Sequence, residues 1–431
     1  MYSIYSALLF LFFVLSLPFY LWKDRGTGKY RASFRERLGR VPASVADGAT
    51  PAVWVHAVSV GEVLAARPLI QALRPRLRGH RIVLSTTTVT GQALARRTIP
   101  EADAVFYAPF DGVRPVRRAL AAVRPALLVL VETELWPNLI RQARQKGARV
   151  ALVNGRISPR SFPRYRLVRR WLARVLGEVD VFLMQAAPHA ERVRSLGAPA
   201  ARVRVAGNLK YNALPAGEPR TPDTLARTLL GGDARRVLWV AGSTMAGEEE
   251  AVLCALHEVR ARAGDVRLVL APRKPERFDE AVAAAERQGF TVARRTALGE
   301  RPWSEGEVLV LDTIGELALV YPLAAVVFVG GSLVPTGGHN VLEPAAAGKA
   351  IVVGPHMENF QEIADEFRAE GALVQVGGAA ELGPAVAGLL ADDERRRDAG
   401  DRARALVQRN RGALEGTLAA LSELLPPGAV Q

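Results

Sequence analysis

Acidic side chains follow two apolar runs in the first half of the chain, where they could act on a bound substrate. Glu62 lies in the loop after a short predicted strand at 52–55. Glu132 and Glu134 follow the apolar run at 126–131. A carboxylate placed at a strand end can act as a general base, although Glu62 could equally stabilise the start of the helix that follows. If both runs belong to one parallel sheet, these acids should face the same cleft, because its strands end at one edge.

A glycine-rich stretch from 324 to 355 could bind a nucleotide. It starts with an apolar run typical of a buried strand, passes through four glycines and enters a predicted helix at Asn340. N–H groups at a helix start attract phosphate, and the carboxylate of Glu343 could hold a ribose diol. A turn rich in glycine for packing alone would look the same. The turn at 242–244, which contains Ser243, repeats this strand, turn and helix pattern.

Alternating apolar runs and helical segments must position these residues. In 431 residues with 49% hydrophobic and 23% charged side chains, they predict an α/β protein with two doubly wound, Rossmann-like domains. We expect a membrane anchor at 1–24, an N-terminal domain at 25–213, a proline-rich linker at 214–223 and a C-terminal domain at 224–431. The last helix is expected to pack back on the first domain.

The uncharged segment from 5 to 22 predicts the anchor. It is eighteen residues long, about the minimum for a membrane span, and aromatic residues lie at both ends. Seven basic residues between 23 and 40 follow it, so the positive-inside rule places the rest of the chain in the cytoplasm. A cleaved signal peptide and an interfacial helix are the alternatives. No basic residue precedes the segment, which disfavours the signal peptide.

The net charge of +14 indicates an anionic partner. The stretch from 154 to 176 holds seven arginines and no acid, with aromatic residues between them. It is either a solvated basic face or a surface that binds the phosphates of a lipid, with Arg166, Arg169 and Arg170 in contact. A nucleic-acid partner is not expected, since nothing else resembles such a module. The single cysteine, Cys254, excludes an intrachain disulfide framework.

Seven motifs in order resemble one family. They are HAVSVGE at 56–62, ETELWPN at 132–138, NGRISPRS at 154–161, GNLKYN at 207–212, AGSTMAGEE at 241–249, APRKPERF at 271–278 and GGSLVPTGGHNVLEP at 330–344. Together they closely resemble the bacterial 3-deoxy-D-manno-octulosonic acid (Kdo) transferases of lipopolysaccharide synthesis. The resemblance implies a GT-B glycosyltransferase fold, CMP-Kdo as donor and a lipid A precursor as acceptor.

The resemblance also implies roles for individual residues. Glu62 matches the general base, and Glu132 and Lys210 match residues that stabilise the transition state. With Ser243, the positions expected to bind the donor are Pro272, Arg273, Ile314, Gly315, Glu316, Asn340, Val341, Leu342 and Glu343. Lys210 and Arg273 could balance negative charge while the donor phosphate leaves in a single inverting displacement. The sequence has no Asp-x-Asp motif, so neither a metal nor a cofactor is expected.

Two positions depart from the family pattern. Met245 and Lys274 stand where histidines are expected, so any part of those histidines in phosphate binding is in doubt. Two other functions are compatible with the motifs considered one by one. The first is a GT-B transferase or epimerase that uses a UDP-sugar, and the second is a basic scaffold at the membrane that binds no nucleotide.

Overall fold

The chain divides into two compact units, which are described separately. The computed structural model describes residues 2–23, 29–46, 50–159, 161–213, 221–230, 236–298, 303 and 306–429. Unit 1 comprises Met1–Ala213 with Asn410–Gln431, and unit 2 comprises Leu214–Arg409. Of the predicted linker at 214–223, residues 214–220 lie outside the described residues.

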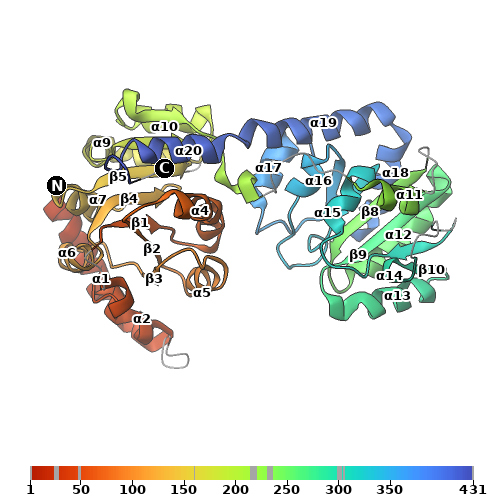
Figure 1. Ribbon diagram of the computed structural model, residues 1–431, viewed down its shortest axis with the longest axis horizontal. Helices are drawn as coiled ribbons and strands as arrows, with labels where there is room; N and C mark the ends of the chain where they lie inside the picture. The colour runs from red at the N-terminus through yellow and green to blue at the C-terminus, as the bar shows by residue number, and fades with distance from the viewer. Residues whose placement is uncertain are drawn as a thin grey trace. The chain divides into compact units, whose positions relative to one another are not determined.

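Unit 1 is built on a seven-stranded parallel sheet in the order β3-β2-β1-β4-β5-β6-β7. The strands are β1 (Ala52–His56), β2 (Arg81–Thr86), β3 (Ala104–Tyr107), β4 (Pro125–Val131), β5 (Arg149–Gly155), β6 (Val181–Met184) and β7 (Val203–Val205). In the central pair, His56 at the end of β1 lies opposite Leu130 of β4. The loops that follow these two strands therefore leave the same edge of the sheet, side by side (Figure 1).

Helices cover both faces of this sheet. They are α2 (Lys29–Arg37), α3 (Ala43–Ala46), α4 (Val60–Leu73), α5 (Val89–Thr98), α6 (Val113–Val123), α7 (Pro137–Gln145), α8 (Phe162–Leu167), α9 (Arg169–Leu176), α10 (Ala187–Ser195) and α20 (Ala413–Ser422), with 3₁₀ turns η2 (Arg74–Arg76), η3 (Ala200–Arg202) and η4 (Leu209–Ala213). Two buried clusters form the core: Trp54 and Phe106 belong to one, Val55 and Leu84 to the other. Leu418 and Leu421 of α20 join the second cluster, so the end of the chain packs on unit 1.

Helix α4 starts earlier than the sequence indicates. Its first residue is Val60, so Glu62, which the sequence places in the loop ahead of the helix, lies inside the first helical turn. The helix ends at Leu73, ahead of Pro75, and tolerates Pro68 in its interior. Ser59 occupies the N-cap position in an extended conformation, which allows the helix to begin directly after the tight loop.

The predicted anchor segment forms helix α1 (Tyr2–Lys23), whose first turns pack on unit 1. The Tyr5 hydroxyl donates to Asp111 Oδ2 at 3.0 Å, and its ring lies 5.4 Å from that of Trp171. Arg141 covers the ring of Tyr2. In the described part of the chain, no helix combines the length and the apolar character needed to cross a membrane. The anchor at 1–24 is therefore not confirmed.

Unit 2 repeats the architecture with a second seven-stranded parallel sheet, in the order β10-β11-β9-β8-β12-β13-β14. The strands are β8 (Val237–Thr244), β9 (Val266–Pro272), β10 (Val292–Arg294), β11 (Val308–Val310), β12 (Val326–Val329), β13 (Ala350–Val353) and β14 (Val374–Gln375). Between β8 and β12 the chain changes direction across the sheet, which is where ligands bind in open α/β sheets. The two doubly wound sheets predicted from the sequence are confirmed.

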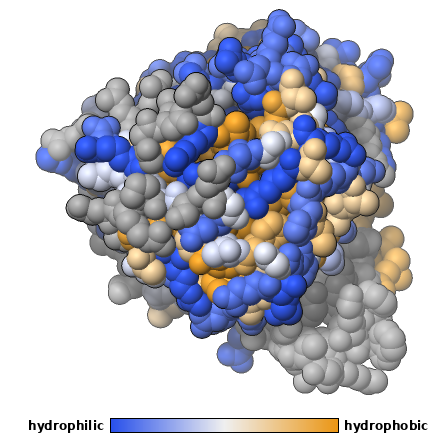
Figure 2. All heavy atoms as spheres, turned by 90° about the vertical axis from the view of Figure 1, so that its right-hand side faces the viewer, coloured by the Kyte–Doolittle hydropathy of each residue, from blue (hydrophilic) through white to orange (hydrophobic). Residues whose placement is uncertain are grey.

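The helices of unit 2 enclose its sheet in the same way. They are α11 (Asp223–Leu230), α12 (Glu248–Ala263), α13 (Phe278–Arg287), α14 (Arg295–Leu298), α15 (Leu317–Val320), α16 (Leu342–Ala346), α17 (Gln361–Ala369), α18 (Ala379–Ala391) and α19 (Asp393–Asn410), with 3₁₀ turns η5 (Pro275–Arg277) and η6 (Tyr321–Leu323). Trp239 and Phe328 are fully buried in the core. Figure 2 shows hydrophilic side chains surrounding and crossing the apolar area of one face, in keeping with the arginine-rich composition.

Candidate active site

Glu62 is held by the loop from which its own helix starts. Its Oε2 accepts a hydrogen bond from Val58 N at 2.6 Å, and its Oε1 accepts one from the Ser59 hydroxyl at 3.0 Å. The residue is only 6% exposed. The carboxyl group is almost completely shielded from water. This burial is the main cause that raises its pKa, to about 8. At neutral pH this carboxyl group is therefore mostly protonated, and its ionised form is a stronger base than an ordinary carboxylate.

Glu132 and Lys210 form an ion pair beside this loop. Glu132 is the first residue after β4 and has φ of 62°, a left-handed conformation that is uncommon for a residue with a side chain. Its amide donates to Val153 O at 2.9 Å, which fixes the turn against β5. Glu132 Oε1 lies 2.9 Å from Lys210 Nζ, which comes from η4. A Cβ added to Gly61 would lie 3.9 Å from the same Nζ, so the structure brings Glu62, Glu132 and Lys210 together.

Glu134, with Trp136, is a neighbour that sequence reasoning did not assign to the site. The Trp136 indole donates to Glu134 Oε2 at 2.8 Å. After burial, the negative charge of Glu134 is the largest cause that raises the pKa of Glu62, and Glu132 adds to it. Burial raises the pKa of Glu134 as well. The available signal was the spacing of the two acids after β4, which indicated a shared cleft but not a role for each.

In unit 2, Arg273, Glu343 and Tyr321 act on one another electrostatically. Burial raises the pKa of Glu343 and Arg273 lowers it, and both of their charges act on the Tyr321 hydroxyl. Tyr321 is fully buried at the start of η6, and any side chain at Gly242 would collide with its hydroxyl group. Tyr321 was missed because its sequence context, an apolar segment, is typical of a core residue.

Asn340 lies directly ahead of Val341, the N-cap of the short helix α16. Its Oδ1 accepts from Leu342 N at 3.0 Å, and its Nδ2 donates to Glu343 Oε1 at 3.1 Å. Val341 and Leu342 are buried, so only their backbone can take part in binding. Ser243, at the end of β8, has φ of 58°, and Pro272 ends β9 just ahead of the exposed Arg273.

Three backbone N–H groups of the glycine-rich loop donate to a side chain of the protein itself. The carboxylate of Glu248 accepts hydrogen bonds from Gly331 N at 2.6 Å, Ser332 N at 2.9 Å and Leu333 N at 2.8 Å. It also accepts one from Met245 N at 2.8 Å. A buried carboxylate therefore takes up these three amides of the glycine-rich loop.

The loop after β11 carries the remaining predicted donor residues. The side chain of Glu316 accepts from the Thr313 hydroxyl at 2.7 Å and pairs with Arg295 at 3.0 Å. Ile314 is 73% exposed, although it is a large apolar residue, and Gly315 has φ of 90°. An exposed apolar side chain such as that of Ile314 can pack against the flat face of a nucleotide base.

The three arginines predicted to bind the acceptor lie on unit 1. Arg166 belongs to α8, and Arg169 and Arg170 begin α9. All three are exposed, and Leu167 between them is 87% exposed. Arg160, in the same basic stretch, lies outside the described residues.

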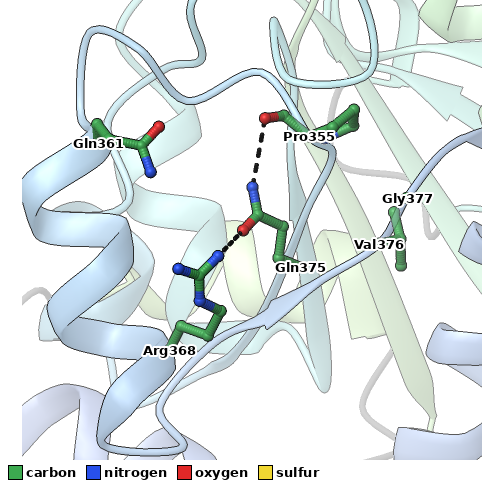
Figure 3. A pocket seen from close by; sticks show the side chains of 6 residues that line it. All are labelled: Pro355, Gln361, Arg368, Gln375, Val376 and Gly377. Carbon is green, nitrogen blue, oxygen red and sulfur yellow. Dashed lines mark hydrogen bonds between the residues drawn. The ribbon is translucent and has the colours of Figure 1, made fainter.

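A pocket of about 430 Å³ lies apart from these residues, beside β13 and β14 (Figure 3). Its lining consists of Pro355, Gln361, Arg368, Gln375, Val376 and Gly377. Arg368 donates to Gln375 Oε1 at 2.5 Å, and Gln375 Nε2 donates to Pro355 O at 3.4 Å (Figure 3). Arg368 and Gln375 are thus engaged in the protein's own hydrogen bonds. The pocket contains none of the predicted site residues.

Comparison with known proteins shows which family the chain resembles in sequence. The family model of 3-deoxy-D-manno-octulosonic-acid transferase (kdotransferase) matches residues 32–213. The 3-deoxy-D-manno-octulosonic acid transferase of Haemophilus influenzae is 33% identical over 430 residues, 98% of this chain and 97% of that protein. The enzyme of that name from Bordetella pertussis is 36% identical over 417 residues, 94% of this chain and 95% of that protein.

A solved structure supports the fold. The glycosyltransferase of kitacinnamycin has a TM-score of 0.50 at 16% identity, and the match covers 88% of this chain and 100% of that one. At this identity the likeness concerns the fold alone. The GT-B arrangement of two Rossmann-like units, expected from the sequence, is confirmed.

Proposed function

Because the chain belongs to the 3-deoxy-D-manno-octulosonic acid transferase family, we propose that it transfers Kdo from CMP-Kdo to a lipid A precursor, lipid IVA, with inversion of configuration and with Glu62 as general base. Membership of the family makes the protein a glycosyltransferase. Glu62 is proposed as the base because it lies at the sheet edge, next to the ion pair of Glu132 and Lys210. The pathway in which this reaction takes part is lipopolysaccharide synthesis.

The reaction requires one proton to be removed and one anion to leave. An acceptor hydroxyl oxygen attacks the anomeric carbon of Kdo, and the bond from that carbon to the CMP phosphate oxygen breaks. Glu62 takes the hydroxyl proton, and CMP carries away the electron pair. A base is most effective when its pKa lies near the working pH, and the buried Glu62 meets this condition.

Two cationic groups would balance the developing charge. Lys210 is held by Glu132 close to the Glu62 loop, where its ammonium group can face the oxygen atoms at the reaction centre. Arg273 lies beside Glu343 in unit 2, where we place the CMP moiety, with Ser243 and the loop 314–316. The ion pairs of Lys210 and Glu316 hold these loops in place before a substrate arrives.

The acceptor surface is proposed on α8 and α9. Arg166, Arg169 and Arg170 are exposed cations that suit the phosphates of an anionic lipid. Helix α1 contacts α9 through Tyr5 and Trp171, and it exposes the apolar side chains Ile4, Leu8, Phe10, Leu11 and Leu15. Apolar and basic groups side by side favour attachment to an anionic membrane. We therefore propose that the protein works at the cytoplasmic face of the bacterial inner membrane.

The test is release of CMP from CMP-Kdo by the purified full-length protein, with and without a tetraacylated lipid A precursor. We expect release that depends on the acceptor, and a loss of about 100-fold or more in Glu62→Gln. In the same assay, changing the three arginines to serine should raise KM for the acceptor and leave KM for the donor unchanged. Absence of CMP release by the wild type would refute the substrate assignment. Full activity of Glu62→Gln would refute the base.

A further inference from the structure

A chain of buried hydrogen bonds runs under the Glu62 loop. The Trp54 indole donates to Ser85 Oγ at 2.7 Å, and Ser85 Oγ lies 2.9 Å from His56 Nδ1. An indole nitrogen can only donate, so the serine oxygen accepts from Trp54 and forms a second hydrogen bond with His56 Nδ1. The ring of His56 is fully buried, and burial lowers its pKa to about 3, so it is neutral.

The ring of His56 in turn supports Trp136. The two rings meet edge to face, with centroids 4.7 Å apart and planes at 77°. Within the part of the chain that the structure describes, His56 Nε2 has no hydrogen-bond partner. Its surroundings are thus mainly aromatic, and an aromatic pair of this geometry is favourable. The neutral imidazole ring of His56 packs against the Trp136 indole and limits its movement.

The backbone of Trp136 is fixed as well. Trp136 is the N-cap of α7, and Pro137 at the next position restricts its conformation. The carboxylate of the buried Asp111 accepts from Asn138 N at 3.0 Å and from Leu139 N at 2.7 Å, which fixes the start of the helix. With both its backbone and its ring held, the indole has little freedom to turn.

The polar end of this indole holds one carboxylate of the acidic cluster. Trp136 Nε1 donates to Glu134 Oε2 at 2.8 Å. The charge of Glu134 acts on Glu62 more strongly than that of Glu132, which has Lys210 as its partner. The charge of Glu134 also acts on Tyr165 of α8, whose pKa is raised by burial and by this charge. The charged groups around Glu62 are thus Glu132, Glu134 and Lys210, with a neutral His56 beneath them.

We propose that Trp136 is a positioning residue for the general base: its indole, braced by His56, holds the Glu134 carboxylate near Glu62 and keeps that negative charge in the catalytic pocket. This inference rests on the proposed function, because it assigns the residue to that same site. A like charge held nearby favours the protonated form of a carboxyl group. Trp136 would thereby set the pH at which the base becomes available.

The experiment compares pH profiles of kcat/KM for the wild type, Trp136→Phe, Glu134→Gln and the double variant, in the full-length protein. Phenylalanine retains an aromatic ring against His56 but cannot donate to Glu134. We expect the acid limb to move to lower pH by roughly half to one unit in each single variant. Because both changes act through the same charge, the double variant should move no further than Glu134→Gln alone.

A matched control is Trp171→Phe. Trp171 also packs on the first core cluster of unit 1, and among the described residues its indole nitrogen has no hydrogen-bond partner. This variant should leave the acid limb where it is. An unchanged limb in Trp136→Phe would overturn the proposal, and so would a shift that is as large in the Glu134→Gln background as in the wild type. Either result would mean that the indole acts by packing alone.

A second readout needs no substrate and separates this inference from the proposed reaction. In protein with ¹³C-labelled glutamate, the carboxyl resonance of Glu62 can be assigned by its absence from Glu62→Gln. Its titration midpoint should fall in Trp136→Phe and stay unchanged in Trp171→Phe. If the wild type releases no CMP but the midpoint falls, the reaction assignment fails and the positioning role holds. An unchanged midpoint refutes that role whatever the activity.

Discussion

Glu62 in unit 1 and Glu248 in unit 2 occupy similar places and have opposite tasks. Each follows a strand, lies in the first turn of a helix and accepts a hydrogen bond from a backbone amide just ahead of it. The carboxylate of Glu248 accepts four backbone N–H groups, three of them from the loop after β12. Glu62 accepts one amide and one hydroxyl, and it faces two other acids.

The difference lies in what each carboxylate can still do. Four amide donors satisfy most of the lone pairs of Glu248, so its charge is used to hold the loop. Glu62 has fewer donors and acidic neighbours, so its ionised form is poorly stabilised and takes up a proton readily. The same residue type at the same kind of helix start is therefore a structural clamp in one unit and, in our proposal, the general base in the other.

The strongest test of this contrast is Glu248→Gln. Each oxygen of Glu248 accepts two backbone N–H groups. The NH₂ group of glutamine replaces one of these oxygens, which leaves two buried donors without an acceptor. We expect the free energy of unfolding to fall by about 3 kcal/mol, measured by urea denaturation of the full chain. The matched control is Glu250→Gln on the same helical turn, where the side chain is half exposed and pairs with Arg287 at 3.5 Å. Equal stability of the two variants would contradict the clamp.

The fold was predictable because its signals are local. Strands buried on both faces of a parallel sheet appear as continuous apolar runs, as at 126–131 and 350–353, and the structure has β4 and β13 there. The sequence placed Glu62 in the loop ahead of α4 rather than in its first turn, because Val60 and Gly61 are weak helix formers and only the N-cap geometry at Ser59 determines where the helix starts.

The candidate site was predictable only in part. The motifs identified Glu62, Glu132 and Lys210, and the structure brings the three together. Their physical environment depends on contacts between distant segments, which no local pattern reveals. Glu248 meets residues more than eighty positions further along the chain. His56 meets Trp136 only because β1 and β4 are neighbours in the sheet.

The next test uses stability rather than activity. The pKa of Glu62 rises from 4.5 to about 8 on folding, mainly through burial, so the folded state binds this proton more tightly than the unfolded state. The stabilisation is complete below pH 4.5 and is lost as the pH rises toward 8. Glu62→Gln carries no such proton. The variant should therefore become more stable than the wild type at pH 9, by on the order of 2 kcal/mol.

This prediction is checked by urea denaturation of both proteins at pH 5 and pH 9. The quantity of interest is the change in their difference between the two pH values, which cancels all other titrating groups. A difference that does not depend on pH would show that Glu62 is already ionised at pH 5. The proposed contrast between the two carboxylates would then be wrong.

The smallest effect is expected from Ser59→Ala, which removes one of the two donors to Glu62. Losing a hydrogen bond to the ionised form raises the pKa of a carboxyl group, so the acid limb of kcat/KM should move to higher pH, by up to about one unit. This direction is opposite to that expected for Trp136→Phe. Ser59→Thr retains the hydroxyl group and should restore the wild-type profile. A shift to lower pH in Ser59→Ala, or none at all, would mean that this hydroxyl does not stabilise the ionised base, and that the backbone amide of Val58 alone holds it.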